Sequence, residues 1–348
     1  MTADGAARAV SYDRPTREDP VRLVIDCDPG NGTPGSDVDD ALAIALALCS
    51  PEVDLRAVTV VAGNVPVDRG VQGAFEVLAA AGAGNVPVHR GAERPLVQDP
   101  RPWRALLDSR RTDSAAQQLW AGLEPAAAVS PPHPMRGPQA LVDAVDAAPG
   151  EVTVLAIGPL TNVATAMLLD RGFERKVARI VWMGGAFEHP DVLQELNAAY
   201  DPEATHIVMT STAPLTVVPL DVTLQTHLRL AEVDRLDAAG TPLGDYLART
   251  VRPWVTWLAG RFGRDGCPLH DPLALAAVLD PEVVRTRLRQ ADVELTGRLT
   301  RGRTVAWDAT DDGLLQVVVP LHEARPVEIA HAVDNDRFMA LLLDRLTA

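Results

Sequence analysis

Five aspartates crowd a short stretch near the N-terminus, VIDCDPGNGTPGSDVDD, which begins with an apolar run. They are Asp26, Asp28, Asp37, Asp39 and Asp40, and all of them lie within fifteen residues. Carboxylates this close repel one another, and a bound divalent cation is the simplest compensation. Because the donors are all oxygens and the chain has no HExxH or paired CxxC motif, Ca²⁺ or Mg²⁺ is favoured over zinc. The alternative without a metal is that Asp39 and Asp40 only cap and charge the helix predicted to follow, DDALAIALAL.

The same stretch has glycines at GxGxxG spacing, Gly30, Gly32 and Gly35, which is typical of a loop that binds a dinucleotide pyrophosphate. Charges about 4 Å apart repel by roughly 4 kcal/mol at an effective dielectric of about 20, so the carboxylates disfavour that ligand. A strand ending in DxD also opens phosphatases of the haloacid dehalogenase type, in which the first Asp is the nucleophile and Mg²⁺ assists. Their motif continues with Thr or Val two positions after the second Asp, whereas Pro29 and Gly30 follow Asp28 here. This alternative is therefore also disfavoured.

The elements that could position these acids follow a regular pattern. Short apolar runs that predict strands alternate along the chain with segments that have a helical pattern. The runs VRLVID, LRAVTVVAG, VTVLAIG and ARIVWMGG are typical of strands buried on both faces. Strand and helix alternation predicts an α/β fold with an open, mainly parallel, Rossmann-like sheet flanked by helices. Ligands bind such sheets beyond the carboxyl ends of the strands. The polar motifs DCD, AGN, GPLTN and MGG are predicted to meet at that edge.

The predicted organisation is a disordered polar leader, residues 1–20, followed by one α/β domain over residues 21–348. Residues 98–136, rich in Pro, Arg and Asp, interrupt the alternation and are expected to form a lid or surface excursion with some helix. After residue 225 the pattern is more helical. The segment ADVELTGRLTRGRTVAWD predicts a small C-terminal hairpin that turns near Arg301 and Gly302, and DNDRFMALLLDRL predicts a closing amphipathic helix.

The charge of the whole chain narrows the class of ligand. A formal net charge of −15 over 348 residues argues against a nucleic-acid or anionic-membrane partner, because both need a basic surface. The longest apolar run, ALAIALALC, is too short to cross a bilayer, and the leader lacks the apolar region of a signal peptide. Three scattered cysteines without disulfide or metal spacing indicate a reducing compartment. We expect a cytoplasmic protein that binds a cation or a neutral polar molecule.

Several motifs resemble, in order, those of the nucleoside hydrolases, the inosine–uridine-preferring N-ribohydrolase family. The signature DxDPGxDDA is present in two halves, DCDPG and DDALA, and TVVAGN, AIGPLTN, WMGGA, ELNAAYDPEA, DGCPLHDPLALA and LTRGRTV follow. The resemblance runs from about residue 21 to the C-terminus, and it disfavours the interpretation in which the acids only cap a helix. It implies calcium-dependent hydrolysis of the N-glycosidic bond of ribonucleosides to ribose and a free base, in purine or pyrimidine salvage. It also implies a homodimer or homotetramer.

The resemblance implies roles for individual residues. The implied calcium ligands are Asp28, Asp40, Asp271 and the main-chain carbonyl of Thr161. Asp28 would also be the base that activates the attacking water. The residues implied to line the ribose site are Asp39, Asn64, Met183, Glu195 and Asn197, with Glu195 near the 5′-hydroxyl.

The residues around the leaving base are less fully specified. His270 is expected to donate a proton or a hydrogen bond to the base, and the alternative is a structural role beside Asp271. Phe262 is expected to flank the base, whereas core packing is the favoured interpretation of Trp254 and Trp257. Two further tryptophans, Trp103 and Trp120, are candidates for a lid that folds over the site.

The chain also departs from the family pattern. Eight residues, 31–38, separate DPG from DD where most members have one, so Asp37 is an alternative to Asp39 as the ribose contact; helix phasing favours Asp39. The usual Gly-Asn before the Glu-x-Asn pair is missing, and His189 or Gln194 is a candidate replacement. No His-Gly-x-x-Gly-like loop is recognisable between residues 91 and 138, so the sequence does not predict the base.

An alternative function from another class is a non-catalytic, calcium-stabilised protein that binds a nucleoside or ribosyl ligand. The intact acids and asparagines weigh against it, because a binding protein needs no base to activate water.

Overall fold

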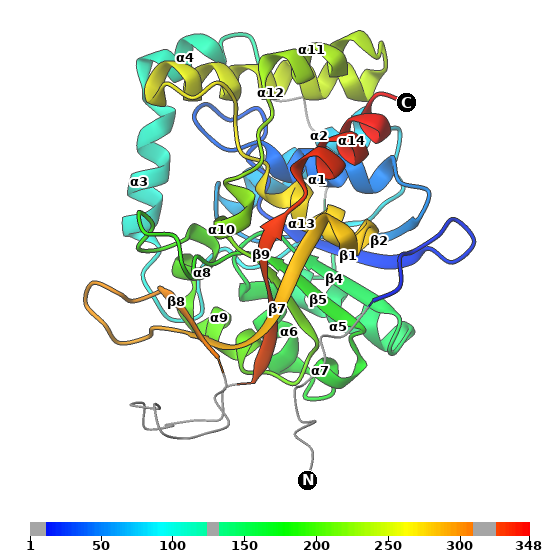
Figure 1. The fold of residues 1–348 in the computed structure, drawn as a ribbon, viewed down its shortest axis with the longest axis vertical. Helices are drawn as coiled ribbons and strands as arrows, with labels where there is room; N and C mark the ends of the chain where they lie inside the picture. The colour runs from blue at the N-terminus through cyan, green and yellow to red at the C-terminus, as the bar shows by residue number, and fades with distance from the viewer. Residues whose placement is uncertain (1–11, 124–131, 309–324) are drawn as a thin grey trace.

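The computed structural model describes residues 12–123, 132–308 and 325–348. Its centre is a nine-stranded sheet of order β3-β2-β1-β4-β5-β6-β9-β7-β8 (Figure 1). The parallel strands are β1 (Val21–Cys27), β2 (Val53–Val60), β3 (Val88–Arg90), β4 (Val152–Ala156), β5 (Arg179–Met183), β6 (Leu215–Val218) and β9 (Pro326–Val333). Strand β7 (Val284–Val293) runs antiparallel to both β9 and β8 (Thr304–Trp307). The predicted open, mainly parallel sheet is confirmed.

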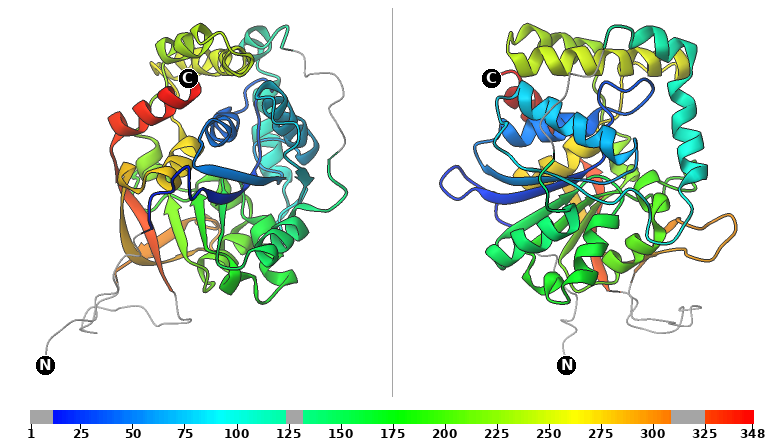
Figure 2. Two further views of the ribbon diagram at one scale, coloured as in Figure 1. Left: turned by 90° about the vertical axis from the view of Figure 1, so that its right-hand side faces the viewer. Right: turned by 180° about the vertical axis from the view of Figure 1, so that it is seen from behind.

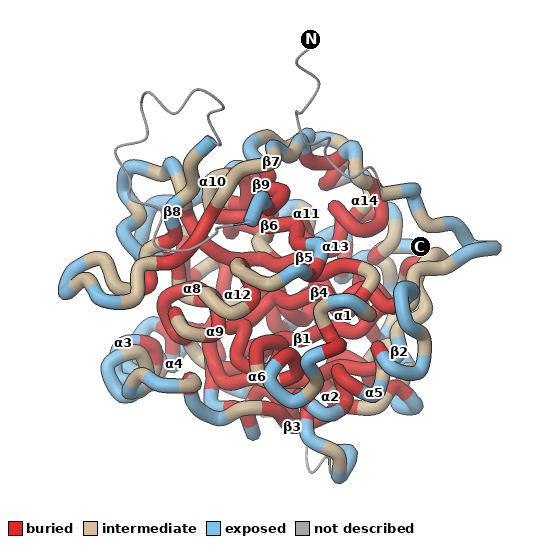
Figure 3. The backbone as a smooth tube through the Cα atoms, turned by 90° about the horizontal axis from the view of Figure 1, so that it is seen from below, coloured by how far each residue is buried: buried red, intermediate tan, exposed pale blue. Residues whose placement is uncertain are grey.

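Helices cover both faces of this sheet (Figures 1 and 2). One face packs against α1 (Asp39–Leu48), α2 (Val67–Ala80), α13 (His270–Leu279) and α14 (Asn335–Leu346). The other face packs against α5 (Gly137–Ala147), α6 (Thr161–Leu169), α7 (Phe173–Lys176) and α9 (Pro202–Met209). Seen from below, the central strands are buried while the periphery is exposed (Figure 3). Apolar strands without alternation fit this two-sided burial.

Helices α1 and α13 are apolar on nearly every side, and almost every residue of each is buried. A helix of this kind must be enclosed by other elements. The two pack against each other, and a further layer lies beyond α1 and α2. That layer consists of α11 (Leu230–Ala238), α12 (Pro242–Phe262) and α4 (Ser114–Leu119). The acidic N-termini of α1 and α13 are thereby held together at one edge of the sheet.

The predicted excursion contains two helices, α3 (Arg101–Arg111) and α4, and residues 124–131 within it lie outside the described part. Figure 1 shows α3 along the side of the molecule, leading to the outer helical layer. The described part of the chain also contains three short elements, α8 (Leu196–Tyr200), α10 (Leu220–Thr223) and the 3₁₀ turn η1 (Pro281–Val283).

The predicted hairpin is formed by β7 and β8. Its turn includes Gly302 at φ +83°, where a Cβ atom would lie 2.6 Å from Ala199 Cα. Only glycine satisfies both the left-handed backbone and this close approach. The hairpin therefore packs directly on the segment that carries Asn197.

Part of the predicted disordered leader lies outside the described residues, namely residues 1–11. From Tyr12 onward the leader contacts the folded protein: the Arg179 guanidinium lies 4.3 Å from the Tyr12 ring centroid, and Arg14 pairs with Asp280 at 3.8 Å. None of the described helices is long and apolar enough to cross a membrane.

Candidate active site

A pocket of about 220 Å³ lies beyond the carboxyl ends of the central parallel strands. Seven of the predicted site residues line it: Asp39, Asn64, Met183, Glu195, Asn197, His270 and Asp271. They come from the ends of β2 and β5, from α8 and from the first turns of α1 and α13. The edge predicted from the strand pattern is therefore where these side chains gather.

Asp28 and Asp40 form the buried floor beside this pocket, and both side chains are 0% exposed. The main-chain nitrogen of Asp28 donates to Asp40 Oδ1 at 2.9 Å, and that of Asn64 donates to Asp28 Oδ2 at 2.5 Å. The other oxygens, Asp28 Oδ1 and Asp40 Oδ2, are buried without a hydrogen-bond partner among the described residues. Unsatisfied buried carboxylate oxygens are costly unless a ligand compensates for the lost water.

Asp39, Asp40 and Asp271 converge, with one carboxylate oxygen of each within 4.8 Å of the others. Asp39 Oδ2 accepts from the main-chain nitrogens of His270 at 3.1 Å and Asp271 at 3.2 Å. Asp39 thus caps α13, while its own helix has no side-chain cap. Asp39 and Asp40 do lie in the first turn of α1, as the alternative without a metal requires, but neither side chain caps that helix. The Asp39 bonds go to α13, and Asp40 accepts from the Asp28 main-chain nitrogen.

Burial and mutual repulsion shift the protonation of these acids. Desolvation raises the pKa of Asp28 to about 7, and the charges of Asp39, Asp26 and Glu195 add to it, against the Asn64 hydrogen bond. Desolvation and neighbouring carboxylates also raise the pKa values of Asp40 and Asp271 well above the ordinary range. The site therefore has buried carboxylate oxygens without hydrogen-bond partners among the described residues, only oxygen donors, and carboxylates whose pKa values are raised. All three properties fit a site for a hard divalent cation.

The structure does not bring Thr161 to the pocket. Its hydroxyl donates to Asp201 Oδ2 at 2.6 Å, and its carbonyl accepts from the Thr165 hydroxyl at 2.7 Å. Ile157, directly after β4, lines the pocket instead, and its carbonyl accepts from Asn197 Nδ2 at 3.1 Å. Sequence reasoning missed Ile157, although it follows a central strand at the same edge as Asp28.

Asn197, Glu195 and Met183 form the opposite wall. Asn197 Nδ2 donates to the carbonyls of Ile157 and Met183, both at 3.1 Å, so its amide oxygen is the group available to a ligand. Glu195 caps α8 and accepts from the main-chain nitrogens of Gly185, Asn197 and Ala198 at 2.8–3.0 Å. Of the two candidate replacements for the missing Gly-Asn, Gln194 lines the pocket and His189 does not.

His270 lies between this pocket and a neighbouring one of about 360 Å³. Its Nδ1 lies 2.7 Å from Thr223 Oγ1, which fixes the ring and leaves Nε2 as the other polar atom. Burial lowers the pKa of His270 below its usual value, so the ring is neutral near pH 7.

Aromatic rings line the neighbouring pocket. Trp254 and Trp257 stack with ring centroids 5.3 Å apart, and Phe262 meets Trp257 edge-on at 6.0 Å. Both tryptophans belong to the core, being 4% exposed, whereas Phe262 is 58% exposed. Of the two lid candidates, Trp103 lines the first pocket, and Trp120 is buried in the core.

The eight-residue insertion is tied to α2 and α12 by buried polar contacts. Asn31 Nδ2 donates to the Tyr246 hydroxyl, which donates to Glu76 Oε2 at 3.2 Å. Arg69 donates to Thr33 Oγ1 at 2.9 Å and to the Asn31 carbonyl. The insertion places Asp37 beside Asp39 and His270, so Asp37 is added to the site and does not displace Asp39.

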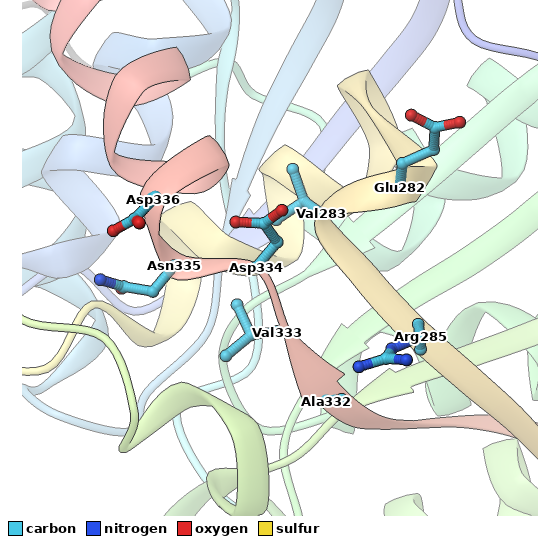
Figure 4. Close-up of a pocket in the computed structure, with 8 residues that line it drawn as sticks. All are labelled: Glu282, Val283, Arg285, Ala332, Val333, Asp334, Asn335 and Asp336. Carbon is cyan, nitrogen blue, oxygen red and sulfur yellow. The ribbon is translucent and has the colours of Figure 1, made fainter.

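A further pocket, about 470 Å³, lies where β9 leads into α14 and shares no lining residue with the acidic site. Figure 4 shows its side chains, Glu282, Arg285, Asp334, Asn335 and Asp336 among them, spread around the wall without converging on one point. It provides no arrangement for chemistry.

Comparison with known proteins agrees with this geometry. The family model of the inosine-uridine preferring nucleoside hydrolases matches residues 23–340. A pyrimidine-specific ribonucleoside hydrolase of Citrobacter koseri is 34% identical over 81% of this chain and 87% of its own. Among solved structures, a plant nucleoside hydrolase has a TM-score of 0.81 at 29% identity, covering 94% of this chain and 99% of its own. A purine-preferring ribonucleoside hydrolase from Gardnerella vaginalis has a TM-score of 0.76 at 28% identity, covering 94% and 98%. The chain belongs to the inosine-uridine preferring nucleoside hydrolase family.

Proposed function

We propose that this protein hydrolyses the N-glycosidic bond of ribonucleosides to ribose and a free base with the help of a bound calcium ion. The observation that supports this most directly is the pair of buried, unpartnered oxygens on Asp28 and Asp40 beside the pocket. The proposed ligands are Asp28, Asp40, Asp271 and a main-chain carbonyl, for which Ile157 is better placed than Thr161. When bound, calcium would lower the pKa of the attacking water and hold the ribose hydroxyls.

The protein's own residues supply the rest of the mechanism. Asp28, held by a hydrogen bond from the main-chain N–H of Asn64, takes a proton from the attacking water. Positive charge develops on the ribosyl carbon as the bond to the base breaks, and the buried carboxylates stabilise it. Asp39, Asn64, Asn197 and Glu195 orient the sugar; Gln194 takes the place of the missing 5′-side asparagine.

His270 faces the leaving base. With Nδ1 engaged by Thr223, Nε2 is the atom that donates a hydrogen bond to the base as it departs. Phe262 flanks the base from the exposed rim. Trp103 lines the pocket together with Leu106, Leu107 and Arg110 of the same helix, the position expected for a lid.

The test is release of reducing sugar from purine and pyrimidine ribonucleosides and from nitrophenyl riboside, with calcium and with a chelator. Calcium-dependent release is expected. Asp28→Asn should lower kcat by roughly 10²–10⁴-fold, the usual contribution of general base catalysis. Asp99→Asn, an exposed acid paired only with Arg101, is the matched control.

Tight binding of calcium and nucleoside without release from any substrate would contradict hydrolysis and favour a non-catalytic binding protein. A fully active Asp28→Asn variant would contradict the assignment of the base.

A further inference from the structure

Arg110 occupies the junction of the two pockets. It lies in the last turn of α3 and, with Asp37, Leu106 and His270, is one of four residues that line both cavities. Its side chain is half-buried, yet among the described residues it has no hydrogen-bond or ion-pair partner. The charge of Asp37, which lines the same two cavities, acts on this guanidinium. Because no described residue accepts a hydrogen bond from Arg110, its N–H donors are available to a ligand, and leaving buried donors unused is costly.

The neighbouring arginines are engaged differently. Arg104, one and a half turns earlier on α3, donates to the carbonyls of Gly63 at 2.6 Å and Asn64 at 3.1 Å. Arg111 pairs with Asp108 at 3.6 Å. Arg261 pairs with Asp113 at 3.4 Å and lies 5.3 Å from the Trp257 ring centroid. These three make hydrogen bonds or ion pairs within the protein, whereas Arg110 lines both cavities, is influenced by the charge of Asp37, and makes no side-chain hydrogen bond with any described residue.

The position of Arg110 is fixed by the insertion at residues 31–38. Gly35, at φ +67°, packs against the main chain of Arg110: a Cβ atom there would lie 2.8 Å from both its Cβ and its carbonyl oxygen. The insertion is in turn held by the Asn31, Tyr246 and Glu76 contacts. From the other side, Arg104 ties α3 to the turn after β2. The guanidinium is therefore presented from a rigid support.

We propose that Arg110 binds the leaving base and stabilises the negative charge that develops on it, an inference that rests on the proposed ribonucleoside hydrolysis. As the bond between C1′ and the base nitrogen breaks, its electron pair passes to the base. Water oxygen bonds to C1′, the water proton passes to Asp28, and the base is reprotonated from solvent while the neutral His270 ring donates a hydrogen bond to it.

The guanidinium takes part in this step only as a hydrogen-bond donor, since it stays charged throughout. It donates to an oxo or ring-nitrogen acceptor of the base, and its effect is greatest when charge has built up there.

The experiment compares Arg110→Gln and Arg110→Lys with wild type on two kinds of substrate. Inosine and uridine have poor leaving groups, whereas nitrophenyl riboside has an activated one that needs little stabilisation. Arg110→Gln should lower kcat on the natural nucleosides by roughly 10²-fold, comparable to losing one donor to a developing anion, and leave nitrophenyl riboside nearly unchanged. Arg110→Lys, which keeps the charge, should recover part of the loss.

Arg101→Gln is the matched control, because Arg101 lies on the same helix, is exposed, and among the described residues forms its ion pair with Asp99. Thermal unfolding of each variant checks that it is folded. Equal losses on all substrates would assign Arg110 to the packing of α3 and overturn the proposal, as would unchanged activity on the nucleosides. A wild-type protein that hydrolyses none of the substrates would overturn the proposed function and this role with it.

Discussion

Asp28 and Asp40 each use one carboxylate oxygen in a main-chain hydrogen bond and leave the second buried and unpartnered. Ordinary fold stabilisation does not explain this, because it would be met at lower cost by an asparagine or an apolar residue. Asp40 and Asp271, the latter in the first turn of α13, each offer an oxygen to the same acidic cluster, and the charge of Asp28 also acts on Asp271. At the scale of single residues, the arrangement is suited to holding a positive charge.

Replacement of Asp271 by Ala should therefore weaken calcium binding and activity together. Removing one carboxylate ligand leaves Asp28 and Asp40 without enough donors for a hard cation that takes 6–8 oxygens. Isothermal titration calorimetry should show at least a 10-fold loss of calcium affinity. Asp99→Ala should bind calcium like wild type, and an Asp271→Ala variant with wild-type affinity would remove this residue from the ligand set.

His270 gives a second prediction at this scale. His270→Ala should reduce turnover of inosine and uridine more than that of nitrophenyl riboside, by about 10²–10³-fold, the usual loss when one hydrogen-bond donor to a developing negative charge is removed. Thr223→Val removes the hydroxyl that holds Nδ1 and should shift activity in the same direction by less. If His270→Ala slows all substrates equally, the residue has only a structural role beside Asp271.

At the scale of elements, the insertion at residues 31–38 acts through its anchor on α12. The Tyr246 hydroxyl connects Asn31 and Glu76 in a buried site. Through this anchor the loop holds Gly35 against α3 and Asp37 against the N-terminus of α13. The loop thus joins α12, α3 and α13 around the side of the pocket where Arg110 and His270 lie.

Tyr246→Phe should lower the free energy of unfolding by about 1–3 kcal/mol, because it leaves Asn31 and Glu76 with unmet hydrogen bonds in a buried site. Tyr200→Phe is the matched control. The Tyr200 hydroxyl is buried without a partner among the described residues, so its removal should cost little. Urea unfolding measures both. A Tyr246→Phe variant as stable as Tyr200→Phe would show that the network does not anchor the loop.

The strand pattern predicted the sheet and the edge at which the site forms, since buried parallel strands have an unambiguous apolar signature. Asn197 and Asp271 were predicted from motifs, and the pocket contains both. Main-chain contributions to the site were harder to predict. Ile157 lines the pocket and its carbonyl accepts from Asn197 because of the path of the chain after β4, which no side-chain pattern encodes. Arg110 was missed because its position depends on contact with Gly35, 75 residues earlier in the sequence.

At the scale of the whole molecule, the acidic site opposes folding when no cation is bound. Desolvation raises the pKa of Asp28 from its ordinary value of 3.8 to about 7. Between these values the folded protein binds more protons than the unfolded chain, so stability falls as pH rises through this window. For Asp28 alone, the free energy of unfolding falls by roughly 4 kcal/mol across this whole pH window.

Metal-free protein should consequently unfold at a lower temperature at pH 8 than at pH 5.5. The proposed calcium ion would bind the ionised carboxylates, so its addition should raise the Tm more at pH 8 than at pH 5.5. Asp26, which is not a proposed ligand, also has its pKa raised to about 7 by burial, so the loaded protein keeps part of the pH dependence. Scanning fluorimetry at both pH values tests this, and an equal gain in Tm at the two would contradict it.

Asp28 and Asp40 leave the ribosome more than 200 residues before Asp271. During synthesis the first two acids therefore exist in a chain that cannot yet neutralise them, and the α1 helix has no α13 to pack against. Domains of this size acquire their long-range contacts late. A chain that ends before α13 lacks Asp271, so the proposed cation site would be incomplete in it. If the ion binds as proposed, it would stabilise the finished protein more than truncated chains, which would then be more open to proteolysis.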